Sequence, residues 1–364
     1  MHRISSYINN LHPAKHKPLY EAIERIIDIA IPLWNQTLTP LKSPDFNHPR
    51  IDYKYCRYDP GPPSRLTGED PGDYYLRYMR WQNDDTRRVV RPEPGQFVSP
   101  SVSQDGKHDE RRVDLKREFG ETGLQVIVKL ANIYLTSDKP RYGGGTWHVE
   151  GQLVRVLANI LPRNCSYMFI SQNEHICATA LYYYDSDNIT ESRLSFRQQT
   201  ADTTRGNIIY EQWRHDWLQE VFGCEQAGPT VQYVGDVITQ EGRLLTFPNV
   251  FQHRVEPFEL LDKSNPGHRK ILALFLVDPH IRIISSANVP CQQRDWWAQS
   301  FMGHGQFRRL PAEMQAEIMS HVDDFPIGIE EAKELRLKLM EERKAFVQRH
   351  EGQFTSEVFS LCEH

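Results

Sequence analysis

Three residues in two short segments have the side chains and the spacing to hold a metal ion. His148 and Glu150 are separated by one residue in segment 143–150 (GGGTWHVE). Alternate side chains of an extended strand point to the same face, so these two can bind one metal from neighbouring positions. His253, in segment 247–255 (FPNVFQHRV), is the candidate third ligand. Two imidazoles and one carboxylate leave coordination positions open, which is typical of mononuclear non-haem Fe(II) oxygenases.

Arg269 is the candidate anchor for an anionic cosubstrate. It precedes segment 271–277 (ILALFLV), which is apolar on both faces as in a strand buried on both sides. A guanidinium at that position costs free energy unless it meets an anion, and its planar fork suits a carboxylate held bidentately. We therefore predict that Arg269 binds the distal carboxylate of 2-oxoglutarate. The alternative is that Arg269 and Lys270 are both solvated at the entrance of the strand.

Further segments follow, in order, a strand pattern that resembles the prolyl-hydroxylase branch of the Fe(II)/2-oxoglutarate oxygenases. These segments are 178–185 (ATALYYYD), 193–197 (RLSFR), 242–249 (GRLLTFPN) and 269–278 (RKILALFLVD). Nearly the whole chain also resembles a fungal domain family of unassigned function within that superfamily. The resemblance implies a double-stranded β-helix with His148, Glu150 and His253 as iron ligands and Arg269 on 2-oxoglutarate.

Tyr183 falls where hydroxylases of this branch often place a tyrosine hydroxyl on the same carboxylate. It shares a strand face with Thr179 and Leu181, which favours an inward position. The alternative is a core tyrosine whose hydroxyl binds a backbone carbonyl.

The chain departs from the family pattern in two ways. Glu150 stands where the superfamily usually has aspartate, and its extra methylene moves the carboxylate outward by about one carbon–carbon bond. Segment 154–172 has no counterpart, and it begins with valine and ends with glutamine. Codons for these residues can carry the GT and AG signals of intron boundaries, so we predict a retained intron in the gene model. A functional lid beside the site is the alternative.

Length and composition predict an ordinary globular protein with no nucleic-acid or membrane partner. The 364 residues are 39% hydrophobic and 25% charged, with a net charge of -5 and scattered basic residues. The six cysteines form no close-spaced pair, so reduced thiols are expected. The N-terminus lacks the apolar core of a signal peptide, and no apolar run could span a membrane. A cytoplasmic location is therefore expected.

The predicted fold class is α+β, with a double-stranded β-helix (jelly-roll, cupin-like) core and flanking N- and C-terminal helices. We expect a helical and irregular region at 1–140, the catalytic core at 141–290 and a helical region at 291–364. Eight strands between 146 and 284 would form two facing sheets with iron at one mouth. Apolar periodicity predicts helices at 18–38, 123–136, 209–221, 292–302, 311–322 and 328–349. Segment 39–100 should be irregular with short strands and wall the substrate, and 101–112 should be mobile.

The site predicts an Fe(II)/2-oxoglutarate-dependent oxygenase that oxidises an unknown substrate with release of succinate and carbon dioxide. A small metabolite or amino-acid-like compound is favoured as substrate, and a peptide is the alternative. Two other functions remain open: a non-catalytic barrel that serves as a binding module, and a cupin-like metal enzyme that does not use 2-oxoglutarate.

Overall fold

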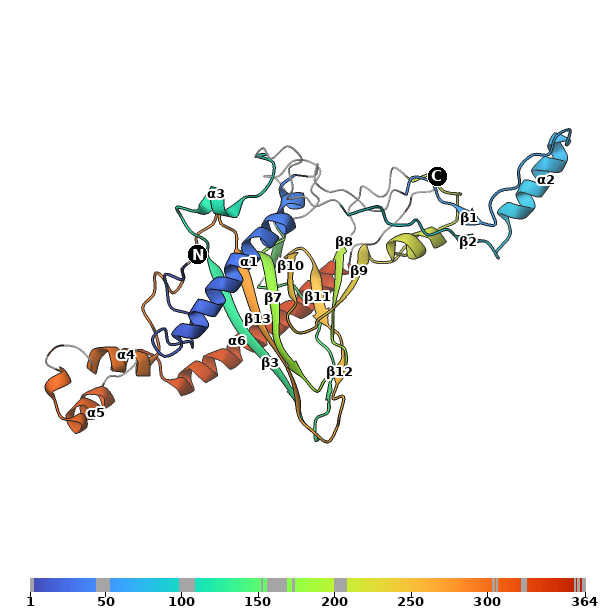
Figure 1. Cartoon of the computed structure of the whole chain (residues 1–364). Helices are drawn as coiled ribbons and strands as arrows, with labels where there is room; N and C mark the ends of the chain where they lie inside the picture. The colour runs from blue at the N-terminus through green and yellow to red at the C-terminus, as the bar shows by residue number, and fades with distance from the viewer. Residues whose placement is uncertain are drawn as a thin grey trace.

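Two antiparallel sheets form the centre of the protein (Figure 1). The computed structural model describes residues 3–43, 53–97, 109–151, 153–155, 169–171, 174–199, 208–302, 305, 307–321, 326–356, 358 and 361. The first sheet has the strand order β10 (Leu244–Pro248), β7 (Ile176–Asp187), β13 (Gly267–Val277) and β3 (Val126–Leu135). The second has the order β11 (Gln252–Val255), β8 (Arg193–Gln199) and β9 (Val231–Ile238).

The two sheets pack face to face around a shared hydrophobic core. One buried cluster joins Leu181, Phe247 and Phe275 of the four-stranded sheet to Leu194 and Phe196 of the three-stranded sheet. Burying side chains of this size stabilises the fold by about 1.5 to 3 kcal/mol each. The expected pair of facing sheets is therefore present, with four and three strands. Among the described residues these sheets do not close into a barrel.

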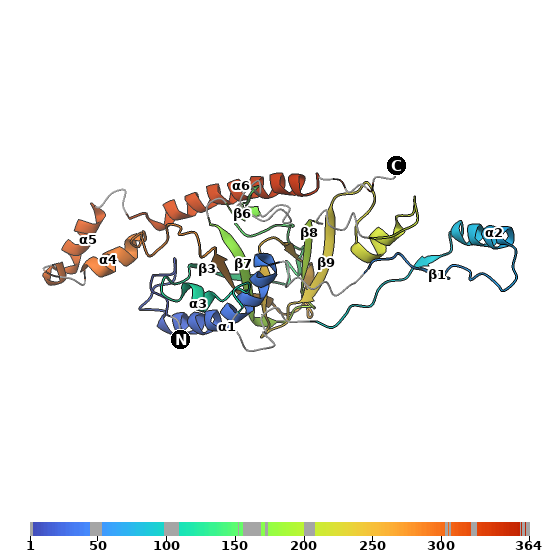
Figure 2. The same cartoon turned by 90° about the horizontal axis from the view of Figure 1, so that it is seen from above.

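Helix α1 (Lys17–Lys42) covers the outer face of the four-stranded sheet, and the prediction of a helix at 18–38 is confirmed. A proline in its first turn suits the start of a helix, where the missing N–H has no partner to lose. Its buried side chains include Ile23, Ala30 and Trp34, which belong to one cluster with Ala178, Ala180, Leu272, Leu274 and Leu276 of the sheet. Figure 2 shows α1 and α6 on opposite sides of the strands.

The C-terminal end of α6 (Ile329–Phe354) packs on the outer face of the three-stranded sheet. Its buried residues are His350 and Phe354. His350 Nδ1 lies 3.1 Å from Gln252 Nε2, and Arg197 forms an ion pair with Glu351. Two further elements precede α6, namely α4 (Arg294–Met302) and α5 (Ala312–Ser320), with the short η4 (Phe307–Arg309) between them. The three helices expected at 292–302, 311–322 and 328–349 are confirmed.

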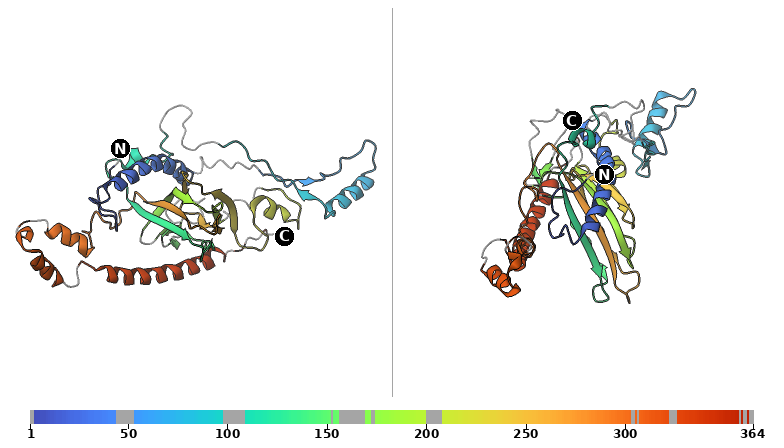
Figure 3. Two further views of the ribbon diagram at one scale, coloured as in Figure 1. Left: turned by 60° about the horizontal axis from the view of Figure 1, so that its bottom comes forward. Right: turned by 60° about the vertical axis from the view of Figure 1, so that its left-hand side comes forward.

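Segment 53–97 forms a projecting hairpin with two short strands, as expected, and a helix between them that was not expected. Strand β1 (Tyr58–Asp59) pairs with β2 (Arg88–Val89), and α2 (Pro71–Gln82) lies between them with no buried residue. Arg87 locks the hairpin to segment 208–224, because both its Nη atoms donate to the carboxylate of Glu211 at 3.0 and 2.8 Å. Figures 1 and 3 show α2 extending away from the sheets, opposite α4 and α5. This helix is therefore not the expected substrate wall.

The helix predicted at 123–136 is wrong, because this segment forms strand β3. Its apolar residues satisfy both the helical and the strand period, but Val126, Ile127 and Val128 are β-branched and favour a strand. Backbone pairing with β13 decides the outcome, since every position from Val126 to Leu135 has a partner there. The sheet thus begins at residue 126 rather than near 146, with an edge strand from the region expected to be helical.

The helix predicted at 209–221 is also wrong in extent. Only its end is helical, with the π-helical turn η3 (Leu218–Phe222), and Trp213 has a φ of 65° that no α-helix accommodates. Trp217 and Leu218 are buried as expected, whereas Trp213 is 71% exposed. The remaining elements are α3 (Leu115–Phe119), β4 (Arg141–Tyr142) paired with β12 (Phe258–Glu259), and β5 (Leu153–Arg155) paired with β6 (Phe169–Ser171).

Several expectations from composition can be compared with the described part of the chain. No helix in it combines the length and the apolar character needed to cross a membrane. The four cysteines that lie in it, Cys56, Cys177, Cys224 and Cys291, are free thiols, as expected. Most of segments 101–112 and 154–172 falls outside the described residues, so those expectations stay predictions.

Candidate metal centre

The backbones of His148 and His253 pair directly, although they are 105 positions apart in the sequence. His148 N donates to His253 O at 3.1 Å, and His253 N donates to His148 O at 2.8 Å. Residues opposite each other in an antiparallel pair carry their side chains on the same face. The two imidazole centroids are accordingly 4.4 Å apart. The irregular segment around His148 therefore extends the three-stranded sheet beside β11.

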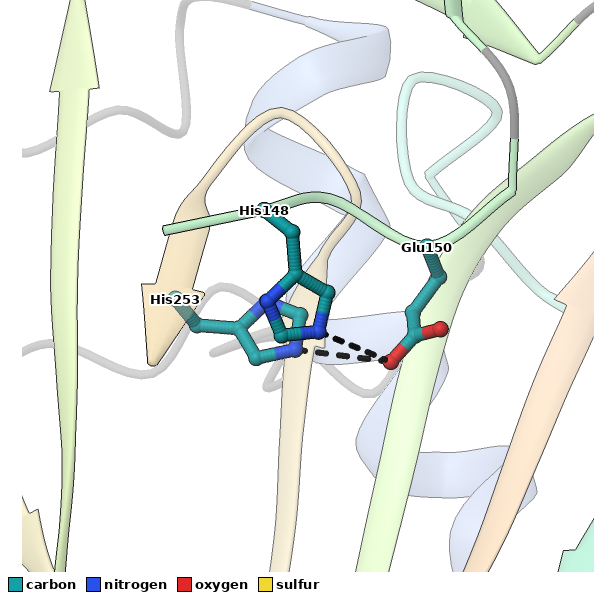
Figure 4. Close-up of side chains that lie close together, drawn as sticks. All are labelled: His148, Glu150 and His253. Carbon is teal, nitrogen blue, oxygen red and sulfur yellow. Dashed lines mark ion pairs between the residues drawn. The ribbon is translucent and has the colours of Figure 1, made fainter. Parts of the chain in front are cut away.

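Glu150 completes the cluster. Its Oε1 lies 3.4 Å from His253 Nε2 and 3.9 Å from His148 Nε2. Figure 4 shows both imidazoles directed at this carboxylate. The three ligand atoms lie within 4.8 Å of one another, and no other group of His, Cys, Asp or Glu in the described chain has such a geometry. This arrangement could hold a metal ion through two nitrogens and one oxygen.

Electrostatics keep the cluster in the protonation state that binds metal. Burial, followed by the charge of His253, lowers the pKa of His148 to about 4. Burial opposes the ionisation of Glu150, but the hydrogen bond and charge of His253 outweigh it and lower the pKa of Glu150 to about 2. At neutral pH the structure thus offers a neutral His148 and an ionised Glu150, which are the ligating forms.

A hydrogen bond selects the tautomer of His148. Its Nδ1 lies 2.8 Å from the carbonyl oxygen of Thr146, which can only accept a hydrogen bond. Nδ1 must therefore carry the hydrogen, and the lone pair of Nε2 is free to face Glu150 and a metal. Sequence reasoning did not find this bond, because it depends on the turn of the backbone between residues 146 and 148.

Asn249 is a second residue that the sequence analysis missed. It is 3% exposed, and its carboxamide bonds both to the backbone of Glu150 and to the carbonyl of Ile176 in β7. It therefore connects the carboxylate ligand to the four-stranded sheet. The only sequence signal was the position of Asn249 at the end of a strand, four residues before His253.

Arg269 is buried, and none of the acidic residues that the structure describes pairs with it. It is 2% exposed, and its Nη1 donates to Ser192 Oγ at 2.6 Å. Its guanidinium lies 5.4 Å from the ring centre of Tyr183 and 5.3 Å from that of Phe258. In the described chain no carboxylate pairs with it and its Nε has no hydrogen-bond partner. Burial lowers its pKa, against the opposing effects of Tyr183 and Tyr142.

The alternative of a solvated Arg269 is therefore wrong. Lys270 behaves differently, because its Nζ donates to Asp185 Oδ2 at 2.6 Å on the other face of β13. An unpaired buried guanidinium costs several kcal/mol. An anion that reaches Arg269 would remove much of this cost.

Tyr183 lies beside Arg269 on the interior face of β7, as its alternation with Thr179 and Leu181 predicts. It is fully buried and belongs to the cluster between the sheets. Burial, partly offset by the charge of Arg269, raises the pKa of Tyr183 to about 12. The hydroxyl therefore keeps its proton and can donate a hydrogen bond.

Arg269 and the His–Glu cluster face the same interior. Ser192, the partner of Arg269, precedes β8 by one residue, while Phe196 of β8 pairs with His253. Four residues of strand separate these two positions, which corresponds to about 13 Å. Phe247 also packs on His253, with ring centres 4.9 Å apart. The metal cluster and the buried arginine therefore lie along one wall of the sandwich.

The solved structures that are similar to this chain include a distant one. The chain is similar to hydroquinone 1,2-dioxygenase PnpCD, solved with Cd2+ and 4-hydroxybenzonitrile, at 13% identity over 46% of this chain and 68% of that chain. The TM-score is 0.18, so this likeness carries no argument about activity. No curated protein matches the chain. The model of a family described as "Protein of unknown function (DUF4246)" matches residues 1–300, and the chain therefore belongs to this family.

Proposed function

We propose that the protein is an Fe(II)- and 2-oxoglutarate-dependent oxygenase that acts on a small molecule, with a core related to the double-stranded β-helix. The observation that supports this most is that a candidate metal cluster and a buried arginine face the same interior between the two sheets. His148, Glu150 and His253 form the candidate metal cluster, and Arg269 is a buried cation that meets no acidic side chain among the described residues.

The donor set fits Fe(II). Two imidazole nitrogens and one carboxylate oxygen occupy one side of an ion and leave its other positions open, as in non-haem iron oxygenases. When bound, iron and 2-oxoglutarate would supply the oxidation of a substrate by dioxygen, with conversion of the cosubstrate to succinate and carbon dioxide. In this proposal His148, Glu150 and His253 are the ligands.

The surroundings of Arg269 fit the distal carboxylate of 2-oxoglutarate. A carboxylate there would neutralise the buried guanidinium and accept hydrogen bonds from it. The hydroxyl of Ser192 accepts from Arg269, so its own hydrogen remains available for the same carboxylate. The protonated hydroxyl of Tyr183 would be a further donor.

The other residues around the cluster position and shield it. Asn249 holds the backbone of Glu150, and the carbonyl of Thr146 orients the imidazole of His148. Phe196 and Phe247 pack against His253 and keep water from that side of the ring. Fixed ligands lower the cost of organising the site when metal binds.

Succinate formation without added substrate tests the proposal, because such oxygenases turn over slowly when uncoupled. The purified protein is incubated with Fe(II), 2-oxoglutarate and oxygen, beside the variants His253→Ala and Lys270→Leu. We expect succinate from the wild type and from Lys270→Leu, and none above background from His253→Ala. A protein that binds iron but neither binds nor consumes 2-oxoglutarate would be a different metal enzyme, and one that binds neither would support a binding module.

A further inference from the structure

Lys129 is a lysine on the interior face of the four-stranded sheet. It lies opposite Ala273 in the register of β3 and β13, and Ala273 belongs to the core between the sheets. Its neighbours on that face, Ile127 and Ile133, also pack against interior clusters. Directly opposed residues of antiparallel strands share a face, so Lys129 faces the second sheet.

The register places Lys129 at the level of the metal cluster. Ile133 pairs with Arg269, and Lys129 lies four residues further along β3. On the opposite sheet, Phe196 lies four residues from Ser192, the partner of Arg269, and pairs with His253. The step from Ile133 to Lys129 and the step from Ser192 to Phe196 both start at the level of Arg269 and run toward the same end of the sandwich. Each covers four residues of strand, or about 13 Å. Lys129 on one sheet and His253 on the other are therefore at matching heights.

The surroundings of Lys129 leave its ammonium group available. It is exposed at the edge strand, and it makes no hydrogen bond or ion pair with the residues that the structure describes.

We propose that Lys129 binds a carboxylate of the substrate and thereby holds the carbon to be oxidised beside the metal cluster. The inference rests on the proposed function, because it names the substrate class of that site: small carboxylic acids, distinct from the cosubstrate held by Arg269. An unpaired lysine that faces the cluster from the opposite sheet fits a charge-assisted hydrogen bond to such an anion. Arg269 is too far along the strands to serve both carboxylates.

Paramagnetic relaxation by Mn(II) tests this without turnover. The full chain is loaded with Mn(II), and the proton relaxation of added compounds reports their binding near the metal. The probes are hexanoate, N-acetyl-leucine and 4-hydroxybenzoate, each measured beside its primary amide. The proteins are the wild type, Lys129→Met, Lys129→Arg, Arg269→Met and Lys270→Met. The last is the matched control, because Lys270 is paired with Asp185 on the other strand face.

We expect at least one carboxylate to bind the wild type more tightly than its amide does. Lys129→Met should weaken that binding about tenfold, while Lys129→Arg and Lys270→Met should retain it. Mn(II) affinity should not fall in Lys129→Met, because the lost charge is positive. The proposal is overturned if no carboxylate is preferred over its amide, if Lys129→Met binds as the wild type does, or if Mn(II) affinity falls in parallel.

The Arg269→Met variant separates this proposal from the proposed function. Monocarboxylate binding that is lost in Arg269→Met but kept in Lys129→Met would assign these anions to Arg269 and overturn the role of Lys129. Relaxation of 2-oxoglutarate itself is measured in the same proteins. Equal affinity of 2-oxoglutarate for the wild type and Arg269→Met would instead contradict the cosubstrate site, whatever the result at Lys129.

Discussion

The carboxamide of Asn249 forms hydrogen bonds with both the N–H and the carbonyl of Glu150. Its Oδ1 accepts a hydrogen bond from Glu150 N at 3.0 Å, and its Nδ2 donates to Glu150 O at 2.9 Å. The same Nδ2 lies 3.0 Å from the carbonyl of Ile176 in β7. One side chain thus fixes the only carboxylate of the metal cluster to the sheet that carries Arg269.

We predict that Asn249→Ala weakens metal binding by about tenfold or more, as is common when a group that holds a ligand is removed. It should also lower the free energy of unfolding by about 1 to 3 kcal/mol, because buried backbone groups lose their partners. Asn188→Ala is the matched control, since Asn188 also bonds several backbone carbonyls but at a distant turn. Anaerobic titration with Fe(II) measures the affinity. Equal metal affinity in the two variants would show that Asn249 has only a structural role.

For Arg269→Leu, we predict that the dissociation constant of 2-oxoglutarate rises by on the order of a hundredfold, as expected for the loss of a charge-assisted pair worth about 3 kcal/mol. Lys270→Leu should have a much smaller effect, because Lys270 pairs with Asp185 on the opposite strand face. Calorimetric titration of the metal-loaded protein under anaerobic conditions gives both constants. A larger effect of Lys270→Leu than of Arg269→Leu would show that Lys270, not Arg269, binds 2-oxoglutarate.

The buried hydroxyl of Tyr183 should make the protein less stable at high pH. Its pKa is raised from 10.0 to about 12, so above pH 10 the unfolded chain releases a proton that the folded chain retains. Stability is therefore lost as the pH rises from about 10 to about 12, by up to roughly 2 to 3 kcal/mol. Tyr183→Phe should remove this component in urea unfolding, whereas Tyr134→Phe, at an exposed tyrosine, should not. Parallel pH curves for wild type and Tyr183→Phe would refute the assignment.

Segment 154–172 remains predicted to be a retained intron. Strands β5 (Leu153–Arg155) and β6 (Phe169–Ser171), which lie in this segment apart from Leu153, pair as a short antiparallel ladder close in sequence to Glu150, so removal of the segment would delete this pair beside the candidate site. Sequencing of mature messenger RNA should find transcripts without these codons. If transcripts consistently encode the segment, and its deletion abolishes activity in a folded protein, the segment is a functional loop.

The closeness of His148 and Glu150 could be predicted from the sequence because alternate residues of extended backbone share a face, although the segment that carries them is irregular rather than a regular strand. The burial of Arg269 could be predicted because it opens a strand that is apolar on both faces. Asn249 could not, since its hydrogen bonds join residues 99 positions apart. The position of Lys129 could not be predicted either, because the apolar residues of β3 fit both a helical and a strand period. Only the pairing of β3 with β13 shows that the segment is a strand. Helix α2 had a usable signal in Asp70 before Pro71, a capping residue followed by a first-turn proline.

The most direct test of the central claim is the visible metal-to-ligand charge-transfer band of the anaerobic protein with Fe(II) and 2-oxoglutarate. The account predicts this band in the wild type and its loss in His148→Ala and in His253→Ala, because two protein ligands hold the metal poorly. Glu150→Asp in the same assay shows whether the backbone at position 150 requires the longer glutamate side chain for metal binding, because the band would then be lost. A wild type without the band, or a full band in both histidine variants, would contradict the assignment of the metal site.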